Sequence, residues 1–199
     1  MIKVPQPSMV LNAPDAPSRY VMHVTYEVKE TEELDIALRQ VRQAALRQPD
    51  KTLRCLIINC HGIYNGTSRQ ATGGYGLALG TGIFARTVHH FNLLREGTAA
   101  DSRGLVHHIW ITACGAAAES QVDAQGDGNG VFLCKDIAKY SGANVTAANI
   151  KQKSWLGLET PYHISGFEGL TRQWAPNGDL TWQHEYSRWP LQSLLHGDN

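Results

Sequence analysis

The sequence predicts an α/β protein with a mainly parallel sheet, sandwiched by helices and extended by a C-terminal β-hairpin. Two nearly continuous apolar runs, residues 53–60 and 105–113, are typical of parallel strands that are covered on both faces. Helical patterns separate these runs, as right-handed crossovers between parallel strands require. An Asn-Gly dipeptide between two later strand patterns indicates the hairpin.

The chain of 199 residues favours one domain, preceded by a short arm. Residues 1–19 are rich in proline and lack periodicity, so we expect an extended arm rather than a core element. Residues 20–199 then form the domain. Its first strand is predicted over residues 20–28, where β-branched and aromatic side chains are frequent.

A helix follows at residues 31–47, where apolar residues recur at helical spacing, and Pro49-Asp50 breaks it before the strand at 53–60. The next elements alternate along the chain and are a short strand at 75–79, a helix at 83–94, the strand at 105–113, helix-favouring residues 116–119, a helix at 131–140 and a strand at 143–148. The hairpin strands are expected at 170–174 and 180–186, around Asn177-Gly178, with a short helix or coil from Pro190.

Charge and composition exclude several classes of partner. Basic and acidic residues are equal at 18 each, so no net field attracts nucleic acid or an anionic membrane. No apolar run approaches a membrane span, and we expect no secretory signal peptide, because no basic region followed by an apolar run is present near residue 1. The four cysteines lack CxxC pairs and are expected to be thiols. We therefore expect a cytoplasmic protein, or one delivered from the producing cell as an effector, whose partner is a protein or peptide substrate; the oligomeric state stays open.

Two predicted strands end in reactive side chains. The first runs into His61-Gly62 and the second into Cys114-Gly115. Since the carboxyl ends of parallel strands meet at one edge, we expect His61 and Cys114 to pair. Imidazole is the side chain best matched to removing a thiol proton, and a helix starting at Cys114 would favour the thiolate. The backbone N–H groups of Gly62 and Cys114 are candidate oxyanion donors.

These motifs resemble the caspase-like cysteine peptidases, which include caspases, metacaspases, gingipains and the self-cleaving domains of bacterial toxins. The resemblance covers roughly residues 53–148, including a segment at 76–80 that is similar to the small strand between the His and Cys segments in bacterial members. It implies a caspase-like fold and a cysteine endopeptidase that hydrolyses peptide bonds through a His61/Cys114 dyad and a thioester acyl-enzyme. No metal or organic cofactor is needed.

The resemblance carries no secure cleavage preference. Caspases have Gln, and metacaspases Asp, two residues before the nucleophile, where this chain has Thr112. Thr112 is nevertheless the candidate substrate-binding residue at that position. Lys151 and Lys153, beyond the strand at 143–148, are candidates for positive charge in the same pocket.

Other interpretations stay open. A catalytically silent relative would keep the fold as an interaction module. A dinucleotide-binding α/β protein is the third possibility, because residues 80–85 match GxGxxA and Asp101 follows about twenty residues later. The remaining cysteines, Cys55, Cys60 and Cys134, lie in apolar segments and are interpreted as packing residues.

Overall fold

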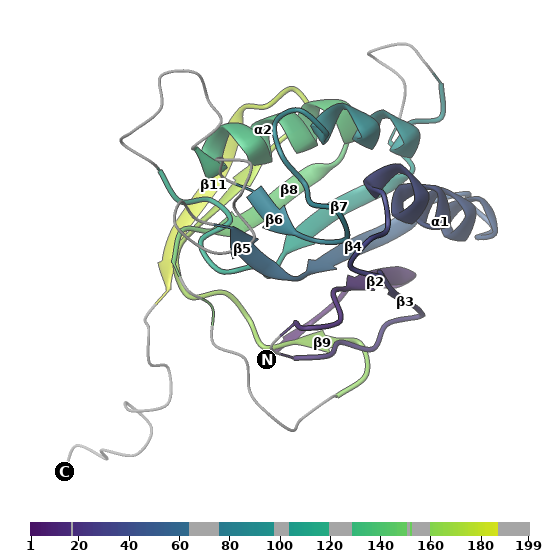
Figure 1. The fold of residues 1–199 in the computed structure, drawn as a ribbon, viewed down its shortest axis with the longest axis horizontal. Helices are drawn as coiled ribbons and strands as arrows, with labels where there is room; N and C mark the ends of the chain where they lie inside the picture. The colour runs from purple at the N-terminus through teal and green to yellow at the C-terminus, as the bar shows by residue number, and fades with distance from the viewer. Residues whose placement is uncertain are drawn as a thin grey trace.

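The computed structural model describes residues 1–16, 18–63, 76–97, 104–119, 129–150, 152 and 160–186. Lys151, Lys153, Asp101 and the segment from Pro190 lie outside these residues. Within them the chain is an α/β protein, as predicted, and its main sheet is mixed and has seven strands (Figure 1). In spatial order its strands are β3 (Val24–Glu27), β2 (Ser8–Asn12), β4 (Leu53–Asn59), β7 (Val106–Ile111), β8 (Asn144–Ala148), β10 (Gly169–Trp174) and β11 (Leu180–Tyr186).

Most of the sheet is parallel. Strands β3, β2, β4, β7 and β8 pair in parallel, whereas β10 joins β8 antiparallel. The predicted hairpin is confirmed, because β10 and β11 pair antiparallel around a turn in which Gly178 has a φ of 85°. Side chains of β4 are buried on both faces, as its apolar run indicates.

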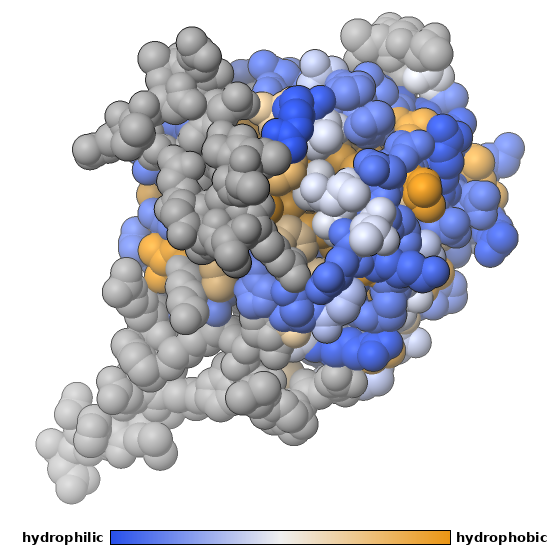
Figure 2. Space-filling view, viewed as in Figure 1, coloured by the Kyte–Doolittle hydropathy of each residue, from blue (hydrophilic) through white to orange (hydrophobic). Residues whose placement is uncertain are grey.

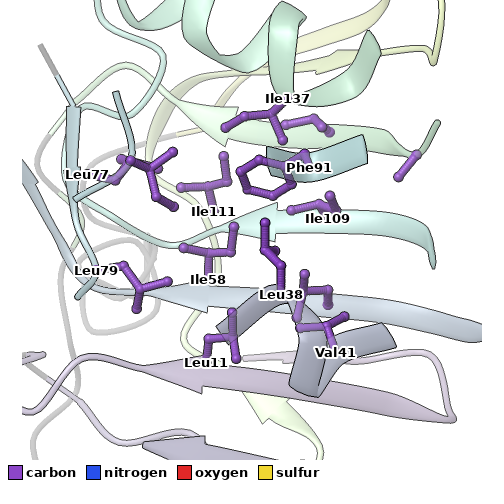
Figure 3. Close-up of a cluster of buried hydrophobic side chains, with 14 of the residues drawn as sticks. Leu11, Leu38, Val41, Ile58, Leu77, Leu79, Phe91, Ile109, Ile111 and Ile137 are labelled. Carbon is purple, nitrogen blue, oxygen red and sulfur yellow. The ribbon is translucent and has the colours of Figure 1, made fainter. Parts of the chain in front are cut away.

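The described helices lie on one face of the sheet (Figure 1). These are α1 (Leu34–Leu46), the 3₁₀-helix η2 (Val88–Leu94) and α2 (Gly130–Ser141). Figure 3 shows their contacts with the sheet, including Phe91 of η2 between Ile137 of α2 and Ile109 of β7. The face of α1 that points away from the sheet is mostly hydrophilic. Figure 2 shows only small, separate apolar areas over this helix.

The prediction of helices on both faces is wrong for the described residues. The opposite face is covered by β1 (Ile2–Lys3), which pairs with β9 (His163–Ile164), and by irregular segments. Val10, Cys55 and Ile57 are buried beneath them. An apolar run indicates that both faces of a strand are covered, but it does not indicate whether helices or other segments cover them.

The expectation that no core element precedes Tyr20 is also wrong. Ser8–Asn12 forms β2, in which every residue is buried, between β3 and β4. The run is short and lies between Pro7 and Pro14, so it shows no clear periodicity. Pairing with two distant strands makes it a strand.

Two predicted helices differ from the structure. The helix expected at 83–94 is confined to η2, because Ile83 exchanges both backbone hydrogen bonds with Leu77. Residues 116–119 do not form a helix, and the chain from Cys114 to Ala117 is a turn instead. Alanine favours a helix, but backbone bonds to β8 and beyond determine this segment, as described below.

Three buried thiols predict a loss of stability at alkaline pH. Burial raises the pKa of Cys55, Cys60 and Cys134, and all three are free cysteines. Above the ordinary thiol pKa the unfolded chain releases protons that the folded chain keeps, so the unfolding free energy falls as pH rises. Each thiol is expected to contribute a loss of about 1.4 kcal/mol per pH unit above pH ~9.

Urea unfolding at pH 8 and pH 10.5 measures this loss. The variant Cys55→Ala/Cys134→Ala is expected to lose less unfolding free energy between the two pH values than the wild type, although its absolute stability at pH 8 is lower. Equal losses in both proteins would show that other groups cause the alkaline effect.

Candidate active site

His61 and Cys114 leave the sheet at the same edge and at the same register. Strands β4 and β7 are neighbours, and Ile58 pairs with Ile111. His61 lies three residues beyond Ile58, and Cys114 lies three residues beyond Ile111. Burial raises the pKa of Cys60, the residue that precedes His61.

The imidazole of His61 is oriented by the main chain. His61 begins β5 (His61–Ile63), which pairs antiparallel with β6 (Gly76–Ala78). Its Nε2 lies 2.7 Å from the carbonyl oxygen of Asp15. A carbonyl oxygen only accepts hydrogen bonds, so Nε2 carries the proton in this contact. In the neutral ring, Nδ1 is then the nitrogen with the free lone pair and can accept a proton.

Cys114 is the half-exposed cysteine of this chain. It opens a turn in which Gly115 has a φ of 60°, a conformation that favours glycine. The turn is tied down by two bonds, from Gly115 N–H to Ile150 O at 2.8 Å and from Ala117 N–H to Ala148 O at 2.9 Å. The thiol lies 3.8 Å from the carbonyl oxygen of Gln152.

The predicted helix N-terminus at Cys114 is wrong. The segment after Cys114 is a turn, and α2 begins only at Gly130. A single turn lacks the aligned peptide dipoles that stabilise a thiolate at a helix start. The turn by itself therefore does not favour the thiolate of Cys114.

The backbone of Gly62 suits an oxyanion donor. Gly62 is paired with Leu77 across β5 and β6, but Leu77 uses its N–H and its C=O in bonds to Ile83. The Gly62–Leu77 pair is therefore a non-hydrogen-bonded pair of the ladder, and the N–H of Gly62 points away from β6. That N–H can face a substrate bound beside His61.

Thr112 is buried where β7 ends, and its hydroxyl contacts β4. Thr112 Oγ1 lies 3.1 Å from Asn59 Oδ1 and 3.3 Å from the carbonyl oxygen of Ile58. The hydroxyl thus joins the two strands that carry the dyad. Its role in substrate binding stays a prediction.

Four residues near the dyad were missed by the sequence reasoning. Asn59 is a polar residue inside an apolar run, which was a visible signal. No such signal marked the other three residues. Asn12 and Asp15 come near His61 because β2 pairs with β4. Gln152 comes near Cys114 because the chain returns past it after β8.

The glycine-rich segment at 80–85 is not arranged as a pyrophosphate cradle. The N–H of Thr81 donates to Glu32 O, and the N–H of Gly82 donates to Leu79 O. A dinucleotide site needs such N–H groups directed at the phosphates, at the start of a helix. Here they are bonded within the protein. Among the described residues, no group of three His, Cys, Asp or Glu side chains is placed to hold a metal ion.

A cavity of about 250 Å³ is lined by residues of β5, β6 and the segment 80–84, and neither His61 nor Cys114 lines it. Ile63, Ala78 and Phe84 line it, and Ala78 is the ladder partner of His61. A larger cavity, of about 1040 Å³, lies between α1, η2 and α2 and contains neither dyad residue. Its Arg42 donates hydrogen bonds to main-chain carbonyl oxygens at the end of η2, which is a structural role.

Alkylation is expected to distinguish Cys114 from the other cysteines. Cys114 is half-exposed and its thiol lies 3.8 Å from the carbonyl oxygen of Gln152, whereas burial raises the pKa of Cys55, Cys60 and Cys134 and shields them. Iodoacetamide should therefore label Cys114 first. Peptide mapping by mass spectrometry identifies the site, and earlier labelling of Cys55 or Cys134 would count against the dyad.

Comparison with protein-family models, with curated proteins and with solved structures finds no match to this chain. In the described part of the chain, no helix is both long enough and apolar enough to cross a membrane. The case for a function therefore depends on the geometry of the dyad and on the two sequence motifs that form it.

Proposed function

We propose that this chain is a caspase-like cysteine endopeptidase that hydrolyses peptide bonds through His61 and Cys114. The observation that carries the proposal is the common register of the two residues at the end of β4 and β7, with His61 oriented by the carbonyl of Asp15. A thiol and an imidazole at one sheet edge form a nucleophile and base pair. The motifs His-Gly and Ala-Cys-Gly at two strand ends supply the resemblance to the family.

The reaction begins with transfer of the Cys114 proton to Nδ1 of His61. The thiolate attacks the carbonyl carbon of the scissile bond, a C–S bond forms, and the electron pair moves to the carbonyl oxygen. The N–H of Gly62, which points away from β6, donates to this oxyanion. Collapse of the intermediate breaks the C–N bond, and His61 protonates the leaving amine.

Hydrolysis of the thioester completes the cycle. A water molecule gives a proton to His61 and attacks the thioester carbonyl carbon. The C–S bond breaks, the acid product leaves, and the proton returns from His61 to the thiolate. The Asp15 carbonyl keeps Nε2 protonated throughout, so Nδ1 is the nitrogen that exchanges protons in each step.

A peptide carrying a thiol-reactive electrophile tests this function. A library of such peptides, varied at the residue before the reactive group, should contain members that add one equivalent to the wild-type chain, at Cys114. Cys114→Ala should remain unmodified, and the preferred residue identifies the cleavage specificity. No adduct on Cys114 from any member, together with no cleavage of an unfolded protein substrate, would reject the peptidase proposal.

A further inference from the structure

The geometry points to Asn59 as a positioning residue for the dyad: we propose that it holds the Asp15 carbonyl against Nε2 of His61. The inference rests on the proposed function and deepens it. Asp15 lies between Ala13 and Ser18, which both bond to Asn59 at the end of β4, and its carbonyl oxygen contacts the imidazole of His61. Whatever holds this segment therefore orients His61.

Asn59 binds the segment on both sides of Asp15. Its main-chain carbonyl accepts from the N–H of Ala13 at 2.9 Å, and its Nδ2 donates to the carbonyl oxygen of Ser18 at 2.6 Å. One residue thus anchors both sides of the loop that carries the Asp15 carbonyl. His61 follows Asn59 by two residues, so the loop and the imidazole share the same support.

Asn12 determines which way the amide of Asn59 points. The two residues are register partners across β2 and β4, and Asn59 Nδ2 donates to Asn12 Oδ1 at 2.8 Å. Asn12 Nδ2 donates in turn to Tyr20 O and to Glu27 Oε1, each at 3.0 Å. If Asn59 turned its amide over, its oxygen would face two acceptors. The arrangement therefore needs a donor at this position, which an aspartate lacks.

The same amide reaches the strand of the nucleophile. Asn59 Oδ1 accepts from Thr112 Oγ1 at 3.1 Å, and Thr112 precedes Cys114 by two residues. The side-chain amide of Asn59 has two donor hydrogens and two acceptor lone pairs. These bonds use both hydrogens and one of the lone pairs. Asn59 therefore links the His61 loop to the Cys114 strand.

Burial makes these bonds strong and specific. Asn59 is 3% exposed, Asn12 1% and Thr112 9%, so water does not replace their partners. An apolar residue at position 59 would stabilise the strand and would avoid the desolvation free energy of burying an amide. An amide is explained by its combination of donor and acceptor, because it donates to Ser18 O and accepts from Thr112 Oγ1 at the same time.

The tautomer of His61 is the readout that a merely structural role would not change. In wild-type protein labelled with ¹⁵N-histidine, the ring is expected to be the Nε2–H form, because the Asp15 carbonyl accepts from Nε2. In Asn59→Asp the donors to Ser18 and to Asn12 are lost, and the Nδ1–H form of His61 should become populated. Iodoacetamide labelling of Cys114 at pH 7 should slow by about tenfold or more.

Two further variants complete the design. Asn59→Ser removes the same donors without burying a charge, so it decides the question if Asn59→Asp does not fold. Asn144→Asp is the matched control, since Asn144 also donates from Nδ2 to a main-chain carbonyl, that of His107, but at the opposite edge of the sheet. It should keep the wild-type tautomer and labelling rate. Cooperative thermal unfolding shows that each variant is folded.

The outcomes separate the inference from the function on which it rests. Folded Asn59→Asp or Asn59→Ser protein with the wild-type tautomer and labelling rate would overturn the inference, even if the enzyme is a peptidase. If His61→Ala labels at Cys114 as fast as the wild type does, the dyad itself fails. A shifted tautomer in the Asn59 variants would still support the positioning role in that case.

Discussion

Cys114→Ala is expected to abolish peptide hydrolysis, and His61→Ala to lower kcat/KM by about 10²- to 10⁴-fold. Without Cys114 no thioester forms, and no other described cysteine is exposed enough to replace it. Without His61 the thiol must lose its proton to water, because Cys114 has no helix N-terminus to favour the thiolate. Initial rates on a fluorogenic peptide, chosen from the electrophile library, measure both effects.

Matched controls test whether the loss is specific. Cys55→Ala removes a buried thiol that belongs to the core on the other face of the sheet, and His89→Ala removes an exposed histidine of η2. Both should keep kcat/KM within a few-fold of the wild type. A His61→Ala enzyme with nearly full activity would mean that another group serves as the base, and the mechanism given above would be wrong.

Phe91→Ala is expected to lower the free energy of unfolding by about 3–5 kcal/mol. Phe91 is fully buried, and its ring lies between Ile137 and Ile109 in Figure 3, where η2 joins α1 and α2 to the sheet. Removing the ring leaves a cavity that these rigid elements cannot close. Urea unfolding at pH 7 gives the difference, and the folded variant should keep its far-UV spectrum.

Asn92→Ala is the control for this substitution. Asn92 is the next residue of η2 but is exposed, so its loss should change the unfolding free energy by less than about 0.5 kcal/mol. A change of under 1 kcal/mol for Phe91→Ala would instead show that η2 does not close this part of the core in solution.

The sequence predicted the elements that local pattern specifies. The apolar runs of β4 and β7 match the observed strands closely, since parallel strands covered on both faces need apolar residues at nearly every position. Asn177-Gly178 identified the hairpin, because the turn needs a residue that accepts a positive φ. His61 and Cys114 could be chosen because strand ends at one sheet edge are where reactive side chains collect.

The tertiary structure alone decided what orients those two residues. The strand β2 has too short a pattern to be read locally and exists through its pairing with β3 and β4. Only that pairing brings Asp15 to His61 and sets Asn12 beside Asn59. Contacts between residues distant in the chain leave no period in the sequence, and neither do main-chain carbonyl partners, because every residue has one. The two residues of the proposed dyad could therefore be chosen from the sequence, whereas the hydrogen bonds around them could not.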